Sequence, residues 1–169
     1  MTTLVPMDQA AFDAFAAVAI EDHAEDSVLA GRWLPEESQA RAQREFERLL
    51  PDGMQTPGHE FFTIRDTEDG EVLGQIWFGQ SATGGERVGF LYNIRLDPRF
   101  RGRGHAARAL QLLDRHALAH EVTVMRLHVF AFNTRAQALY RAAGYGFTLC
   151  ILFMADINHM SSALLVKMG

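Results

Sequence analysis

The residues of this chain best suited to chemistry form a glycine-rich turn, 101-RGRGHA-106. The turn lies between an apolar run at 88–96 and an amphipathic run that begins near Gly104. Because Gly102 and Gly104 have no side chains, a ligand can approach the backbone closely, and a helix N-terminus directs unpaired N–H groups toward it. Arginines in the same turn add forked donors. These features indicate a phosphate-binding site, and the alternative is an exposed basic loop.

Asn133 and Tyr140 form a second candidate site. Asn133 is placed to cap a predicted helix over 134–143, and Tyr140 lies two turns further along the same face. A phenol is neutral at pH 7 and can donate a proton without a metal. Asparagine is also an ordinary helix cap, and an aromatic side chain at helical spacing is commonly a core residue. From the residues alone, a structural and a catalytic role both stay open.

The composition is that of a folded protein. The chain has 169 residues, of which 48% are hydrophobic and 22% charged, so we expect one domain over 1–169 with a substantial core. The single cysteine, Cys150, rules out an intrachain disulfide and fits a reducing compartment. The chain begins without a basic leader, and no apolar run is long enough to cross a bilayer. We therefore expect a cytoplasmic protein with no membrane partner.

The charge of the chain is unevenly distributed. The net charge of −5 argues against a nucleic-acid partner. Residues 1–93 carry 6 arginines against 17 acidic side chains, whereas residues 94–169 carry 9 arginines and one lysine against 4 acidic side chains. The second part therefore favours a polyanionic ligand and the first part a cationic one.

The elements that must position these residues alternate between helical and extended patterns. Helices are predicted over 8–22, 35–50, 104–120 and 134–143, and strands over 2–6, 60–65, 71–80, 87–96 and 122–130. Short connections predict an antiparallel meander for the early strands. A helix separates 87–96 from 122–130, which predicts a parallel pair joined by a right-handed crossover. The fold class is therefore α/β with a mixed sheet (α+β) and about four helices.

The tail contains two apolar runs, 147–155 and 163–168, separated by a polar connection. They can pair with each other as a hairpin, or an apolar edge of this length can pair with a second subunit in a homodimer. Both alternatives stay open.

In these motifs and in the order of its elements, the chain resembles the GNAT (Gcn5-related) N-acetyltransferase superfamily. The family's acetyl-CoA signature, Gln/Arg-x-x-Gly-x-Gly/Ala, is matched by Arg101, Gly104 and Ala106. A second family motif is matched by Asn133, Ala136, Leu139, Tyr140, Gly144 and Tyr145. The likeness covers nearly the whole chain.

The resemblance implies a GNAT fold that moves the acetyl group of acetyl-CoA directly to an amine of a small molecule or peptide. It places the CoA pyrophosphate on the backbone amides of the turn, which are those of Arg101, Gly102, Arg103, Gly104, His105 and Ala106. It implies that the pantetheine arm pairs with the backbone of Ile94, Arg95 and Leu96 like an added strand, beside a V-shaped cleft. Asn133 is then a contact of CoA or acceptor, and Tyr140 the acid that protonates the leaving thiolate.

The general base is not identified by the resemblance. Many relatives place a carboxylate on the strand before the turn, where this chain has Asn93 and Arg95, and neither is a base at pH 7. The alternatives are a water chain and five side chains elsewhere, namely His128, His59, Glu60, Glu21 and Glu25.

Other readings of the motifs are weaker. His116 and His120 have the spacing of a metal clip, but no third ligand accompanies them, so no metal is expected. A loose dinucleotide fingerprint at Gly102 lacks the acidic residue that should follow the next strand. The missing strand carboxylate also permits a CoA-binding regulatory or interaction module, and a transferase for longer acyl chains is a third possibility. The resemblance also implies that the first two helices border the acceptor side, so their acidic residues favour a cationic amine or a basic peptide N-terminus as acceptor.

Overall fold

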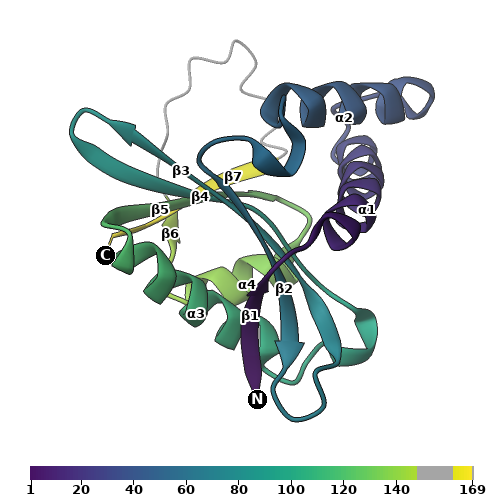
Figure 1. Ribbon diagram of the computed structural model, residues 1–169. Helices are drawn as coiled ribbons and strands as arrows, with labels where there is room; N and C mark the ends of the chain where they lie inside the picture. Colours follow the sequence, from purple (N-terminus) through teal and green to yellow (C-terminus); the bar gives the residue numbers. More distant parts are fainter. Residues whose placement is uncertain (148–161, 169) are drawn as a thin grey trace.

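The computed structural model describes residues 1–147 and 162–168, and Figure 1 shows the arrangement of their helices and strands. Within this part of the chain, one sheet has the strand order β1-β2-β3-β4-β5-β7-β6. The elements in chain order are β1 (Thr2–Pro6), α1 (Gln9–Leu29), α2 (Pro35–Leu49), β2 (His59–Asp66), β3 (Val72–Thr83), β4 (Glu86–Leu96), α3 (His105–Ala119), β5 (Val122–Phe130), α4 (Thr134–Ala142), β6 (Gly146–Phe147) and β7 (Ser162–Met168).

The sheet is mixed, as the sequence predicts. β1 to β4 pair antiparallel in succession, and β4 then pairs parallel with β5 across the α3 crossover. β7 pairs antiparallel with β5 on its other side. The α/β mixed-sheet prediction is therefore confirmed, including the single parallel pair among the described strands.

β4 and β5 part before either strand ends. Their register begins at Arg87↔Val122 and its last pair is Leu91↔Leu127, although β4 continues to Leu96 and β5 to Phe130. At the same point β4 contains a bulge, because Trp77 of β3 is opposite Asn93 while the next residue, Phe78, is opposite Leu91. Tyr92 is thus the extra residue. A bulge bends the strand that carries it, which explains why the pairing with β5 stops here.

Each face of the sheet packs against its own pair of helices (Figure 1). On one face the core includes Ile76, Leu127, Leu110 of α3 and Tyr140 of α4. On the other face, α1 and α2 cover Phe61 and Trp77 of the sheet. Phe12 and Phe15 of α1 and Phe46 of α2 pack against these two residues. Neighbouring strand residues alternate between the two cores, as expected for the two-residue period of a strand.

α1 is longer than the sequence pattern predicts, because it ends at Leu29 and not near residue 22. The prediction relied on apolar positions in its first half. The second half is rich in acidic residues, yet it buries Ala24 against Trp33 and Ala42 of the following segment. This packing lets the helix continue through a stretch with little apolar character.

The described residues include only part of the predicted pairing between the two apolar runs of the tail. Gly146 and Phe147 pair antiparallel with Val166 and Leu165 of β7. Most of the apolar run 147–155, with Cys150, lies outside the described residues.

Candidate active site

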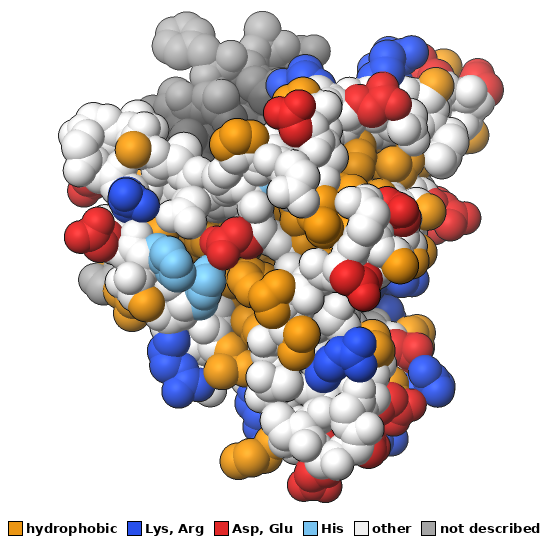
Figure 2. All heavy atoms as spheres, in the orientation of Figure 1, with side chains coloured by type: hydrophobic (Ala, Val, Ile, Leu, Met, Phe, Trp, Pro, Cys, Tyr) orange, Lys and Arg blue, Asp and Glu red, His pale blue; other side chains and the backbone are white. Residues whose placement is uncertain are grey.

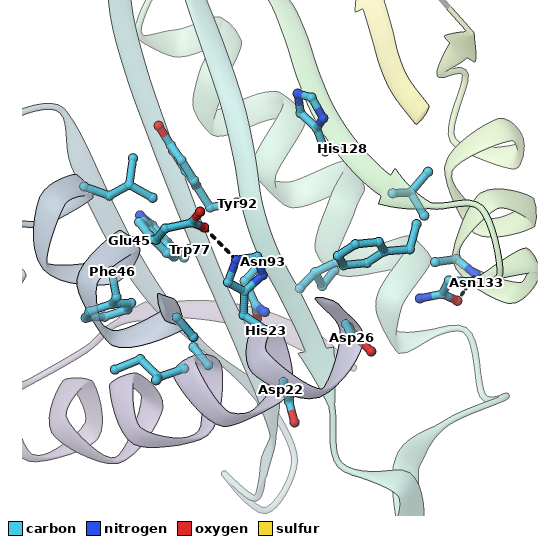
Figure 3. A pocket seen from close by; sticks show the side chains of 18 of the residues that line it. Asp22, His23, Asp26, Glu45, Phe46, Trp77, Tyr92, Asn93, His128 and Asn133 are labelled. Carbon is cyan, nitrogen blue, oxygen red and sulfur yellow. Dashed lines mark hydrogen bonds and ion pairs between the residues drawn. The ribbon is translucent and has the colours of Figure 1, made fainter. Parts of the chain in front are cut away.

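A cavity of about 280 Å³ lies where β4 and β5 part (Figure 3). α1 and α2 supply Asp22, His23, Asp26, Glu45 and Phe46 to its lining. The sheet and α4 supply Trp77, Tyr92, Asn93, Ile94, His128, Phe130, Asn133 and Tyr140. The carboxyl ends of two diverging parallel strands are a usual ligand site in such sheets.

The cavity reaches both faces of the sheet. Trp77 and Tyr92 stack with ring centroids 4.4 Å apart on the face covered by α1 and α2. Ile94 and Tyr140 pack in the core on the face of α3 and α4. Because all four line one cavity, the opening between β4 and β5 connects the two faces at this point.

Tyr140 lies in the wall of this cavity. Its side chain is buried, and burial raises the pKa of the phenol to about 12. The hydroxyl therefore keeps its proton throughout the physiological range. Asn133 also lines the cavity, and its Oδ1 accepts a hydrogen bond from the Ala136 N–H at 3.1 Å. The predicted capping role of Asn133 is thus present, and its amide nitrogen donates to no other described residue.

The glycine-rich turn adopts the conformation that only glycine takes easily. Gly102 and Gly104 have φ values of 76° and 82°, and Gly104 is the N-cap of α3. A Cβ on Gly104 would meet no atom within 4 Å, so the space beside the turn is open. His105 contacts the Thr2 hydroxyl through Nδ1 at 3.0 Å, so its side chain is engaged with β1 while its backbone begins the helix.

The arginines around the turn have different roles. Arg101 donates from Nε to the Leu96 carbonyl at 3.0 Å, which ties the turn to the end of β4. Arg95 instead bonds Asp22 of α1, with Nε 2.9 Å from the carboxylate, so its side chain faces the acidic part of the cavity. Arg135, in the first turn of α4, brings its guanidinium to 4.0 Å from where a Cβ of Gly102 would stand. The sequence motifs do not include Arg135, although its position two residues after Asn133 could have indicated a cation near the turn.

Three carboxylates of α1 and α2 line the cavity. Asp22 bonds Arg95, and Glu45 bonds His23 Nε2 at 2.9 Å. The pKa of Asp26 is raised, chiefly by burial and then by the nearby charge of Asp22. Figure 2 shows acidic side chains over α1 and α2, in agreement with the predicted acidic character of this region. Asp22 and Asp26 are one helical turn apart, but the predicted end of the helix near residue 22 hid that relation.

The five candidate bases do not converge. Glu21 and Glu25 are exposed and do not belong to the cavity lining, and Glu60 bonds His116 Nε2 at 2.9 Å. His59 accepts the Trp77 indole N–H at Nδ1 and lies outside the lining. Of the five, His128 lines the cavity.

The His116 and His120 rings lie 4.4 Å apart, but His116 is paired with a carboxylate. Across the residues that the structure describes, no cluster of three or more potential ligands is arranged for a metal.

Asn93 lines the cavity. Its Oδ1 is buried and has no hydrogen-bond partner among the described residues. A buried amide oxygen without a partner is costly, so a donor from a ligand would be favourable there.

Comparison with known proteins agrees with this geometry. The model of the acetyltransferase (GNAT) family matches residues 20–145. The chain belongs to the GNAT acetyltransferase family. Two relatives from Bacillus subtilis strain 168 are named as uncharacterized N-acetyltransferases. This GNAT chain is 33% identical to YycN over 142 residues, 84% of the chain and 90% of the relative. It is 32% identical to YdgE over 146 residues, 86% of the chain and 92% of the relative.

Solved structures confirm the GNAT fold. The crystal structure of YycN superimposes with a TM-score of 0.83 at 32% identity, covering 88% of this chain and 94% of that one. The coenzyme A complex of PaiA N-acetyltransferase from Thermoplasma acidophilum gives a TM-score of 0.70 at 15% identity, covering 100% and 99% of the two chains. At that identity the likeness concerns the fold alone. No helix in the described part of this GNAT chain is long and apolar enough to cross a membrane.

Proposed function

We propose that this GNAT chain, acting as one domain over residues 1–169, transfers the acetyl group of acetyl-CoA directly to the amine of a small cationic molecule or peptide. The observation that carries the proposal is the cavity at the β4–β5 opening, which has a protonated phenol on one face and carboxylates on the other. An acetyl group held there lies between a proton donor and a site for a cation.

The donor fits the edge of β4 and the turn that follows. Beyond Leu91, β4 is no longer paired with β5, so an extended pantetheine arm can pair with Ile94, Arg95 and Leu96 as an added strand. The open glycine turn and the first N–H groups of α3 suit the pyrophosphate. The guanidinium groups of Arg103 and Arg135 add positive charge near the same turn. The residues present therefore fit CoA.

The reaction needs no protein nucleophile. The amine nitrogen attacks the thioester carbon, the C–S bond of the tetrahedral intermediate breaks, and Tyr140 gives its proton to the sulfur. The described residues of the cavity lining include no serine, cysteine or lysine, which agrees with direct transfer. Close positioning of amine and thioester supplies much of the rate.

The acceptor side suits a positive charge. Asp26 lies in the cavity without an ion-pair partner among the described residues, whereas Asp22 and Glu45 each have one. The indole of Trp77 and the phenol of Tyr92 add aromatic faces that attract a cation. An ammonium group bound here would offset the charge of Asp26.

A CoA-binding regulator of the same fold is the second candidate. It is favoured by Asn93 and Arg95, two residues that cannot act as a base at pH 7, on the strand where the GNAT resemblance leads us to expect a carboxylate. Such a protein would bind acetyl-CoA and leave amines unchanged.

The test is release of free CoA thiol from acetyl-CoA by the purified protein with spermidine, 1,5-diaminopentane, benzylamine and a short basic peptide. We expect release that depends on a cationic amine, with the acetylated amine found by mass spectrometry. Tight binding of acetyl-CoA in calorimetry without any acetylated product would favour the regulator. Absence of acetyl-CoA binding would refute both candidates.

A further inference from the structure

We propose that His128 is the catalytic base on the acceptor side of the cavity, where it takes the proton that the amine loses as it attacks the thioester. This inference rests on the proposed function. The last β4–β5 pair is Leu91↔Leu127, so His128 is the first residue of β5 beyond the point where the strands part. In Figure 3, His128 and Tyr92 stand on either side of this opening.

The direction of the His128 side chain follows from the period of the strand. Leu127 and Val129 are buried in the core that faces α3 and α4, so His128 projects from the opposite face. There its ring lies 5.4 Å from Phe90, which in turn contacts Tyr92 at 4.7 Å between centroids. This is the face that α1 and α2 cover.

Base and acid are therefore separated by the sheet and joined by the cavity. Tyr140 packs in the core on the α3 and α4 face, and His128 lies on the other, yet both line the same cavity. In acyl transfer the amine adds to the thioester carbon on one side while the sulfur leaves on another. A base on the acceptor face and an acid on the opposite face match these two requirements.

The ring nitrogens of His128 are available. No hydrogen bond to another described residue holds either of them, whereas His59, His23 and His116 each bond a neighbour through a ring nitrogen. His128 is exposed and lines the cavity. The surrounding protein lowers the pKa of His128 by desolvation, and Arg32 lowers it further, so the imidazole is neutral at pH 7.

Among the residues that the structure describes, few groups face His128 from neighbouring elements. Arg32 comes from the segment between α1 and α2 and lies over the Phe130 ring at 6.0 Å. Tyr92 of β4 contacts the Phe90 ring that lies against His128, and burial raises the pKa of Tyr92, so its phenol stays neutral. None of these groups is an acid that would hold a proton on the imidazole.

The proton balance closes with these residues. The free amine attacks the carbonyl carbon, and its N–H proton passes to a ring nitrogen of His128. The C–S bond then breaks, and Tyr140 supplies the proton of the CoA thiol. His128 releases its proton to solvent and Tyr140 regains one, so the products are the amide and CoA thiol.

The test compares His128→Gln with His120→Gln, because His120 is an exposed histidine at the end of α3, outside the cavity lining. With the amine that wild-type protein acetylates best, His128→Gln should lower kcat about 100-fold and leave the acetyl-CoA Kd unchanged. His120→Gln should behave as wild type. Added imidazole should restore part of the activity of His128→Ala.

The pH profile supplies the second readout. The base must be neutral to act, so wild-type kcat/KM should fall with decreasing pH at an apparent pKa below the ordinary histidine value of about 6.5. That acidic limb should be absent in His128→Gln. If wild-type protein acetylates an amine and His128→Gln has the same kcat, the His128 inference is overturned while the proposed function stands. The same holds if the acidic limb is lost in Asp26→Asn and kept in His128→Gln. A wild-type protein that acetylates no amine would overturn it together with the proposed function.

Discussion

The Arg95 guanidinium lies 2.9 Å from the Asp22 carboxylate, and this ion pair joins β4 to α1 beside the cavity. Both side chains are partly exposed, so the pair contributes little to stability, about 1 kcal/mol or less. Its position matters more, because it holds the acidic turn of α1 against the strand that is proposed to bind pantetheine.

Substitution Arg95→Gln should therefore separate donor binding from acceptor binding. Pantetheine is expected to bind the β4 backbone and not the Arg95 side chain, so the acetyl-CoA Kd should change less than about 2-fold. The KM for the acceptor amine should change by more than the acetyl-CoA Kd does. The KM should fall if freed Asp22 binds the ammonium. Calorimetry with acetyl-CoA and steady-state kinetics measure the two quantities. A large loss of acetyl-CoA affinity would show that the Arg95 side chain contacts CoA.

Tyr140→Phe should lower kcat by about 100-fold with little change in acetyl-CoA affinity, because it removes only the proton for the sulfur. Tyr145→Phe is the matched control, since its ring lies 6.0 Å from Tyr140 in the same core but outside the cavity lining. It should keep kcat near the wild-type value. Equal loss of activity in both variants, in step with their melting temperatures, would make Tyr140 a core residue.

Asp26→Asn should raise the stability of the protein at pH 7 and weaken binding of the acceptor amine. The folded protein raises the pKa of Asp26, so folding opposes its ionisation; this cost appears as pH rises above the ordinary carboxyl pKa and is complete once pH exceeds the raised pKa. The gain in melting temperature should therefore be present at pH 7 and vanish toward pH 3. Loss of a charged partner should raise the acceptor KM about 10-fold or more. Unchanged KM for every cationic acceptor would exclude a role of Asp26 in amine binding.

Arg135→Gln should weaken acetyl-CoA binding several-fold, because its guanidinium lies beside the glycine turn. The loss should shrink at high salt, where charge attraction is screened. Arg115→Gln, at an exposed position late in α3, is the control and should bind acetyl-CoA as wild type does. An identical Kd for both variants would place the phosphates away from Arg135.

The elements that could be predicted from the sequence are those defined by local signals. The turn at Gly102 and Gly104 and the helix after Asn133 depend on residues close together in the chain, and the structure places both as expected. The cavity acids are different. Asp26 reaches the site only because α1 continues past its apolar half to pack on Trp33, which is a tertiary effect.

The proposed base could not be identified from the sequence for a related reason. The faces of a strand alternate predictably, but the bulge at Tyr92 shifts that alternation in β4 and ends the pairing with β5. Only the register shows that His128 is the first residue past the last pair. No pattern of residues in the sequence predicts the point at which β4 and β5 separate.

The central claim is acetyl transfer to a cationic amine, and the most direct measurement uses acetyl-CoA with an isotopically labelled acetyl group. Wild-type protein and Tyr140→Phe are incubated with the amine panel, and the products are weighed by mass spectrometry. We predict labelled amide with wild-type protein and about 100-fold less at early times with the variant. Acetyl-CoA bound by the protein with no label in any amine would contradict the account.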